Sequence, residues 1–298
     1  MNPSLLLTLI SVAAALTVCY LGAGVIMHPP AMSRMEVFPE QLGLRYEKVS
    51  FKTSDGLSLK GWFIPSPRGP QEKRTLIMCH GWGDNKGELL RFTHFLNDIA
   101  GLNLFYFDFR SHGESEGEIT TLGYYELIDF AAAIRYLMDN KPWAVEHLGV
   151  FGQSMGAAVT VMSMPDHPEI KAAVLESPFT DYRQVVRQWA WNRFHIPYFP
   201  IIVVTLWMLR WRVGEAGVAT YSPRRFIAKI APRPLLIIGG QDDALMPESD
   251  VRKLFSAAKE PKQLWIVPEA VHAKCHERGG LEYETRVTGF FNRHLKLE

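Results

Sequence analysis

Gly152-Gln153-Ser154-Met155-Gly156 places a serine between two glycines, each two residues away. The residues before this stretch, 147–151, are mostly apolar and predict a strand, and residues 157–162 after it predict a buried helix. The glycines allow the strand and the helix to approach closely, and they allow the serine a strained backbone angle that exposes its hydroxyl. The stretch therefore predicts a nucleophilic serine on a tight strand-to-helix turn.

Strands and helices alternate along most of the remaining chain. Two strands with Ser54-Asp55-Gly56 as their turn predict an antiparallel hairpin over 45–51 and 57–64. Further strands are predicted at 75–79, 102–107, 172–175, 235–238 and 264–267, and helices at 87–100, 122–140 and 281–297. This order predicts an α/β fold with a mostly parallel central sheet and helices on both faces. Reactive groups then belong on loops at the carboxyl ends of the strands.

Ser154, Asp243 and His272 each lie on a loop that follows a predicted strand. Their order along the chain is the order that an α/β-hydrolase architecture requires of a catalytic triad. Because a serine hydroxyl needs a base, His272 would accept its proton, and Asp243 would hold the imidazole in the correct tautomer. We expect the backbone N–H groups of Trp82 and Met155 to bind the oxyanion. This chemistry needs no metal and no organic cofactor.

Each of these roles has alternatives. Ser154 could be only the N-cap of the helix that follows it. Asp242 could be the acid, with Asp243 capping the next helix. The further alternatives are His276 or His112 as the base, and Glu176 or Asp181 as the acid of a rearranged triad. We expect His80 to have a structural role and to shape the loop that carries Trp82.

From about Arg45 to its end, the chain resembles the α/β-hydrolase fold serine hydrolases, and it is most similar to the Bem46-like group of membrane-anchored or lipid-active proteins. The resemblance is carried by His80-Gly81-Trp82-Gly83, Asp108-Phe109-Arg110-Ser111-His112-Gly113-Glu114-Ser115, the Ser154 turn, Glu176-Ser177-Pro178-Phe179, the segment from Asp243 to Pro247, and His272. In this family the aspartate lies four residues before the proline, which implies Asp243 rather than Asp242. The family includes esterases, lipases, thioesterases and peptidases, so the resemblance implies acyl transfer to water.

The N-terminal segment has a different composition. No Asp, Glu, Lys or Arg precedes Arg34, and Leu, Val, Ala and Ile dominate residues 4–27. A run of about 20 apolar residues can cross a bilayer as a helix. We therefore predict a single uncleaved membrane anchor over residues 1–33, a linker over 34–44 and the hydrolase domain over 45–298. Arg34, Arg45 and Lys48 follow the span, which favours a cytoplasmic catalytic domain.

Three other interpretations of this segment exist. A cleaved signal peptide would carry a positive charge before its apolar run, and none is present. Leu16-Thr17-Val18-Cys19 resembles a bacterial lipoprotein box, in which Val18 fits poorly. The segment could also be a buried core helix. If it is an anchor, we expect its removal to give a soluble protein that still hydrolyses a short water-soluble ester, because the segment carries no catalytic group.

An insertion of about residues 178–225 is predicted to form a cap over the site. No charged residue occurs from Phe194 to Leu209, and four of the eight tryptophans lie in or beside this stretch, namely Trp189, Trp191, Trp207 and Trp211. Their large apolar area favours burial, either as the core of the cap or around an acyl pocket that touches the bilayer. We expect Phe179, Trp207 and Leu209 to bind the acyl group of the substrate.

The composition excludes several classes of protein. A net charge of +1 gives no basic surface for nucleic acid. Cys19, Cys79 and Cys275 are widely spaced, so a disulfide framework or a zinc site is not expected. The sequence predicts a serine hydrolase that cleaves carboxylic esters or thioesters with apolar acyl groups, with membrane lipid as its other partner. The alternatives are a peptidase or amidase on the same fold, and a binding protein without catalytic activity.

Overall fold

An eight-stranded sheet forms the centre of the computed structural model, which describes residues 2–28, 35–214 and 221–296. The order across the sheet is β1-β2-β4-β3-β5-β6-β7-β8. β1 and β2 form the predicted hairpin, β2 pairs antiparallel with β4, and all later pairs are parallel. The strands are β1 (Glu47–Lys52), β2 (Ser58–Ile64), β3 (Arg74–Cys79), β4 (Asn103–Phe107), β5 (His147–Gln153), β6 (Ile170–Glu176), β7 (Leu235–Gly240) and β8 (Lys262–Val267).

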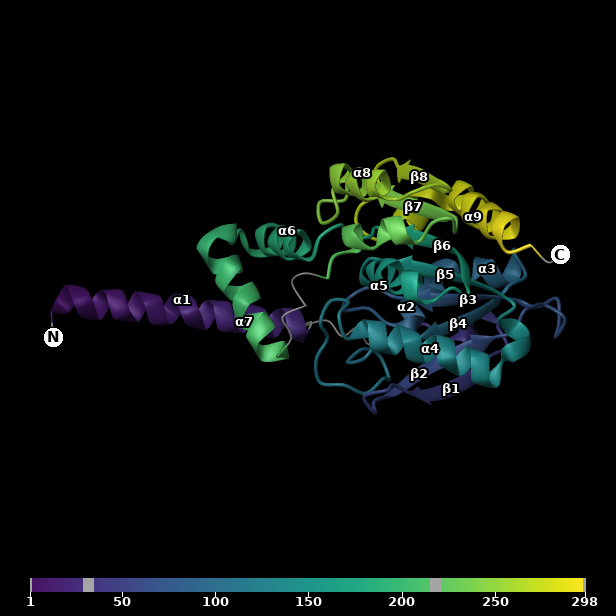
Figure 1. Cartoon of the computed structure of the whole chain (residues 1–298), viewed down its shortest axis with the longest axis horizontal. Coiled ribbons are helices and arrows are strands. Elements are labelled where there is room, and N and C mark those ends of the chain that lie inside the picture. The colour runs from purple at the N-terminus through teal and green to yellow at the C-terminus, as the bar shows by residue number, and fades with distance from the viewer. Residues whose placement is uncertain (1, 29–34, 215–220, 297–298) are drawn as a thin grey trace.

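Helices cover both faces of this sheet (Figure 1). One face packs against α4 (Glu126–Asn140), α5 (Met155–Ser163) and α8 (Glu248–Ala257). The other packs against α2 (Lys86–Thr93), α3 (Phe95–Asp98) and α9 (Cys275–His294). Every residue of β3, β4 and β7 is buried, as expected for parallel strands covered on both sides. The described residues also include short turns: η1 (Pro39–Leu42), η2 (Pro142–Ala144), η3 (Met164–Asp166), η6 (Pro223–Arg225) and η7 (Ile227–Lys229). The predicted fold class is therefore confirmed.

Three helices differ from their predicted bounds. α4 begins at Glu126 rather than at 122, because its carboxylate accepts hydrogen bonds from the N–H groups of Thr121 and Gly123 and holds that turn outside the helix. The predicted helix over 87–100 is divided into α2 and α3. The closing helix begins at Cys275, six residues before the predicted start, and bends at Gly280, where φ is 48°.

The cap segment follows β6 and consists of α6 (Tyr182–Phe194), the π-type turn η4 (Tyr198–Ile202) and α7 (Val203–Val213). The N-terminal helix α1 (Pro3–Met27) projects from the domain, and α7 lies across its C-terminal part (Figure 1). The predicted boundary between anchor and linker at residues 33 and 34 lies outside the described residues. So do residues 215–220 of the predicted cap and 297–298 of the predicted closing helix.

α1 has two parts with different surroundings. Its large side chains from Leu5 to Leu21 are largely exposed, whereas Ala23, Ile26 and Met27 are buried against the domain. The 25 residues make a helix about 37 Å long at 1.5 Å per residue, and the apolar core of a bilayer is about 30 Å thick. By length and composition α1 can therefore cross a membrane.

Candidate active site

Ser154 lies on the turn between β5 and α5, with φ of 52° and ψ of −113°. A positive φ is rare for a residue with a side chain and marks local strain of the kind that functional sites hold. Two close backbone approaches keep the turn in place. A Cβ atom at Gly152 would lie 2.7 Å from the Ala157 Cα, and one at Gly156 would lie 2.2 Å from the Cys79 carbonyl oxygen. The two glycines are therefore needed for the approach of α5 to β3 and β5.

We expect Gly156→Ala to destabilise the fold by about 3 kcal/mol, because the added methyl group meets backbone atoms that cannot move independently. Urea unfolding in detergent measures this as a lower midpoint. Gly289→Ala on α9 is the matched control, since its methyl group meets nothing within 4 Å and alanine favours a helix. Equal midpoints for the two variants would contradict the prediction.

The structure brings Ser154, His272 and Asp243 together in one hydrogen-bonded chain. The Ser154 Oγ lies 3.0 Å from the His272 Nε2, and the His272 Nδ1 lies 2.8 Å from the Asp243 Oδ2. The other carboxylate oxygen of Asp243 accepts hydrogen bonds from the N–H groups of Leu245 and Met246. With Nδ1 donating to the buried carboxylate, Nε2 is left to accept the serine proton.

The alternative acids and the alternative use of Ser154 have other surroundings. Asp242 is exposed, and Asp181 caps α6 by accepting the N–H of Arg183 at 3.0 Å. Ser154 is the N-cap residue of α5, yet its side chain makes no capping hydrogen bond and contacts His272 instead.

The alternative bases lie on other loops and helices. His276 contacts Glu284 at 3.1 Å and stacks on Phe95. His112 accepts the N–H of Gly83 and donates to the Arg110 carbonyl, and its burial lowers the pKa of its imidazole. Neither histidine is bonded to Ser154.

His80 connects two loops beneath the site. Its Nε2 accepts the N–H of Phe109 at 3.0 Å, and its Nδ1 lies 2.7 Å from the Gly81 carbonyl oxygen. Burial lowers the pKa of this imidazole well below its usual value. A neutral His80 therefore fixes the start of the loop that carries Trp82.

Glu176 forms hydrogen bonds with residues that follow His272. Its buried carboxylate accepts hydrogen bonds from the Tyr283 hydroxyl and from the Cys275 N–H, and burial raises its pKa. The adjacent Ser177 hydroxyl accepts the N–H of Ala273 at 3.4 Å. The residues that follow His272 are thus tied to the end of β6. Tyr283 was not predicted from the sequence, because an isolated tyrosine in an amphipathic helix carries no signal for such a role.

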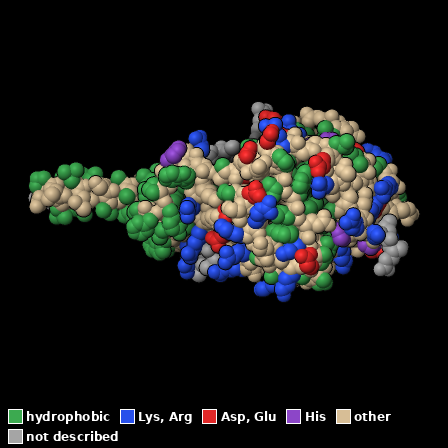
Figure 2. All heavy atoms as spheres, turned by 90° about the horizontal axis from the view of Figure 1, so that it is seen from above, with side chains coloured by type: hydrophobic (Ala, Val, Ile, Leu, Met, Phe, Trp, Pro, Cys, Tyr) green, Lys and Arg blue, Asp and Glu red, His purple; other side chains and the backbone are tan. Residues whose placement is uncertain are grey.

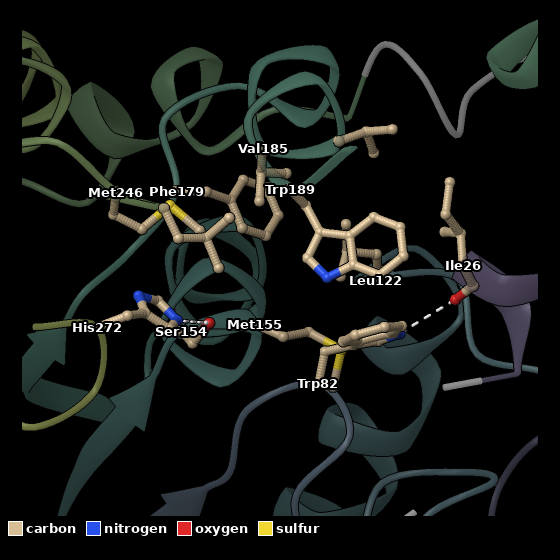
Figure 3. Close-up of a pocket in the computed structure, with 12 residues that line it drawn as sticks. Ile26, Trp82, Leu122, Ser154, Met155, Phe179, Val185, Trp189, Met246 and His272 are labelled. Atoms are coloured by element: carbon tan, nitrogen blue, oxygen red, sulfur yellow. Dashed lines mark hydrogen bonds between the residues drawn. The ribbon is translucent and has the colours of Figure 1, made fainter. Parts of the chain in front are cut away.

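Trp82 and Met155, the two predicted oxyanion residues, both line the same cavity as Ser154. The loop carrying Trp82 passes close to the serine, since a Cβ atom at Gly81 would lie 3.4 Å from the Ser154 Cβ. The Trp82 indole N–H donates to the Ile26 carbonyl oxygen at 3.0 Å (Figure 3). A residue of α1 therefore fixes the ring beside the candidate nucleophile.

This cavity has a volume of about 150 Å³, and its lining is almost entirely apolar (Figure 3). Beside Ser154 and His272, its walls are Ile26, Trp82, Leu122, Met155, Phe179, Val185, Val186, Trp189, Leu245 and Met246. Of the three predicted substrate residues, only Phe179 is among them. Trp207 is 63% exposed and Leu209 is buried elsewhere in the cap. The cap contributes to this cavity through α6 instead.

Ile26 also changes the interpretation of the N-terminal segment. The sequence predicted that residues 1–33 carry no catalytic group, and the structure adds a contact that was not foreseen: the Ile26 side chain lines the cavity, and its carbonyl group accepts the Trp82 indole N–H. The N–H of Thr120 also donates to the Met27 carbonyl oxygen at 3.0 Å. The C-terminal end of α1 therefore forms part of the cavity wall, while the rest of the helix projects from the domain.

A mostly parallel sheet, a serine on the turn after β5 and a histidine and a carboxylate after the last strands define the class of α/β hydrolases. Comparison with known proteins agrees. The model of the family described as serine aminopeptidase S33 matches residues 70–227, so the chain belongs to this family, and it is a Bem46-like α/β hydrolase.

Three similar proteins illustrate the relationship. The chain is 32% identical to YfhR of Escherichia coli K12 over 249 residues, which covers 82% of this chain and 80% of that one. It is 26% identical to bem46 of Schizosaccharomyces pombe, with 78% and 73% covered. The solved esterase Pf2001 of Pyrococcus furiosus is 26% identical, with a TM-score of 0.74 over 91% of this chain and 99% of that one. These relationships support hydrolase activity.

Proposed function

We propose that this protein is a membrane-anchored serine hydrolase that cleaves carboxylic esters or thioesters with apolar acyl groups. The observation that carries the proposal is the hydrogen-bonded chain from Ser154 through His272 to Asp243, which opens into a nearly apolar cavity. Such a chain activates a weak nucleophile, and the cavity wall provides burial for an acyl group.

The first half of the reaction forms an acyl-enzyme. The Ser154 Oγ attacks the carbonyl carbon while its proton passes to the His272 Nε2, and the carbonyl electron pair moves to the oxygen. The N–H groups of Trp82 and Met155 donate to that oxyanion. As the carbonyl re-forms, the C–O or C–S bond breaks, and the leaving alcohol or thiol takes the proton from His272.

The second half reverses the roles with water. His272 accepts a proton from water as the water oxygen attacks the acyl carbon, and then returns it to the Ser154 oxygen as the carboxylic acid leaves. Asp243 stabilises the imidazolium form in both halves. Its carboxylate is held by two backbone N–H groups and lies 2.8 Å from the His272 Nδ1, so it does not need to move.

The described lining of the cavity also favours esters over the substrates of an aminopeptidase. Such a peptidase must bind a charged α-ammonium group, and a buried charge is costly without a partner. The residues that line this cavity include no carboxylate. An apolar acyl group, in contrast, gains from contact with Phe179, Val185 and Trp189.

Exposed apolar side chains of the cap are a second argument for membrane anchoring by α1. Several large apolar side chains of α6, η4 and α7 are exposed near α1, and Figure 2 shows hydrophobic side chains gathered where the projecting helix joins the domain. They include Trp191, Phe194, Phe199, Trp207 and Trp211. Aromatic side chains of this kind are enriched at membrane–water interfaces. Arg45 and Lys48 follow α1 in the chain, which favours a cytoplasmic catalytic domain.

A fluorophosphonate probe and a panel of acyl esters test the proposal on the full chain in detergent. We expect covalent labelling at Ser154 and at least a tenfold higher kcat/KM for an octanoyl than for an acetyl ester. Each methylene buried in the transition state is worth at most ~0.8 kcal/mol, about fourfold in rate. Aryl amides of single amino acids serve as the peptidase control. Faster cleavage of these amides than of the esters would move the assignment to a peptidase, and absence of labelling would favour a binding protein without catalytic activity.

A further inference from the structure

A second cavity lies between α1 and the cap, next to the cavity that contains Ser154. It has a volume of about 50 Å³ and an almost wholly apolar lining. One side is formed by Val18, Gly22 and Val25 of α1, and the other includes Ala190, Ile201 and Thr205 of the cap. We call it the outer cavity, and the one that contains Ser154 the inner cavity.

Three residues lie between the two cavities. Ile26, Val186 and Trp189 line both of them. The Trp189 ring meets the Trp82 ring edge-on, with 5.8 Å between the ring centroids (Figure 3). Because these residues border both cavities, a change in the side-chain conformation of Trp189 and Ile26 is the movement that would join them.

The outer cavity borders the part of α1 that leaves the protein core. Val18 is 46% exposed, while Ile26 further along the helix is buried. On the cap side, Phe194 lines the outer cavity and is itself half-exposed. The outer cavity therefore begins where α1 would meet the bilayer.

The size of the inner cavity adds a second argument. Cavities that enclose whole small ligands measure ~300–1,000 Å³, whereas the inner cavity measures about 150 Å³. A long acyl chain with its carbonyl group at Ser154 needs further apolar space. The outer cavity adds about 50 Å³ beside α1, and the rest of a long chain would extend beyond it along α1 into the bilayer.

We propose that the substrates are lipids whose long acyl chains reach Ser154 sideways from the bilayer, between α1 and the cap, through the outer cavity and past Ile26 and Trp189. This inference rests on the proposed esterase function and gives it a substrate class and an entry route. A short soluble ester does not need the outer cavity, so the two kinds of substrate respond differently when it is filled.

Ala190→Phe fills the outer cavity without changing a residue that lines the inner one. We expect it to lower kcat/KM at least tenfold for a palmitoyl ester of 4-methylumbelliferone in phosphatidylcholine vesicles. The butyryl ester of the same fluorophore should stay within twofold. Arg183→Phe, at an exposed position of the same helix, is the matched control and should leave both rates unchanged. Gly22→Leu fills the cavity from α1 and should repeat the result if Ala190→Phe does not fold.

The same variants can be tested without turnover. In the Ser154→Ala background, phosphatidylcholine with a diazirine near the end of one acyl chain should crosslink to residues 182–205, and Ala190→Phe should reduce this severalfold. Equal losses for both esters, no loss for either, or unchanged crosslinking would overturn the entry route while leaving the esterase function in place. Failure of the unmodified protein to hydrolyse either ester or to take the fluorophosphonate label would overturn the esterase function itself and this inference with it.

Discussion

Ser154→Ala and His272→Ala are each expected to lower kcat/KM for a short-chain ester by about 10⁴-fold, because the members of a triad act as a unit. Initial rates of ester hydrolysis by the full chain in detergent measure the loss of kcat/KM. Unfolding midpoints close to that of the unmodified protein would show that the fold is retained. Activity of Ser154→Ala within tenfold of the unmodified protein would contradict the assignment of the nucleophile.

The neighbouring aspartates provide a matched pair for the acid. Asp243→Asn should reduce kcat by several orders of magnitude, because an amide in place of the carboxylate favours the wrong imidazole tautomer. Asp242→Asn should change kcat less than twofold, since Asp242 is exposed and Asp243 contacts His272. The reverse pattern would assign the acid to Asp242.

Deleting residues 1–33 is expected to lower kcat/KM for a short ester by about tenfold to a hundredfold. The deletion removes the acceptor of the Trp82 indole N–H, and a polar group left without its partner costs ~1–3 kcal/mol. It also removes the Ile26 wall of the inner cavity. The prediction from the sequence was only that the deleted protein still hydrolyses a short ester, and these two contacts add the expected loss.

Two variants of the full chain separate these contributions. Trp82→Phe removes the indole donor and keeps an aromatic ring, so it should reproduce a severalfold part of the loss. Ile26→Ala keeps the backbone carbonyl group and opens the cavity wall, so it should mainly affect longer acyl chains. A protein without residues 1–33 that is as active as the full chain would show that α1 is not part of the active site.

In membranes, the full chain should resist extraction by alkaline carbonate, as a spanning helix does.

The central sheet and the candidate triad were accessible to sequence reasoning because their signals are local. Apolar runs of strand length identify buried strands, and Ser154, Asp243 and His272 each lie on the loop that follows one of them. Parallel strands place their carboxyl ends at the same edge of a sheet. The proximity of groups more than a hundred residues apart in the chain can therefore be predicted even when the structure of the loops between them is not known.

The substrate residues of the cap were predicted less well, although the spacing of apolar residues in its helices indicates which positions are buried. The buried positions around α7 are Ile202, Thr205, Leu206, Leu209 and Val213, which recur at helical spacing. Trp207 and Trp211 lie four residues apart on the opposite face and are exposed. The absence of charge from 194 to 209 indicated an apolar environment. Only this helical periodicity distinguishes the face of α7 that packs against the protein from the face that is exposed.

The contribution of α1 to the site could not be predicted from the sequence. Ile26 and Trp82 are 56 positions apart, and their contact joins an indole N–H to a backbone carbonyl group. Every residue carries such a carbonyl, so the sequence does not identify the acceptor. An almost uniformly apolar helix also has no polar face to show which side packs against the domain.

The two parts of α1 imply two different tolerances to sequence change along one helix. From Leu5 to Leu16 the helix is exposed and needs only to remain apolar, so one aliphatic residue can replace another with little effect. Ala23, Ile26 and Met27 are packed in a protein core, where even one added or missing methylene is felt. Drift among homologous chains should therefore be rapid along the first part and slow along the last turn and a half, although both parts are apolar.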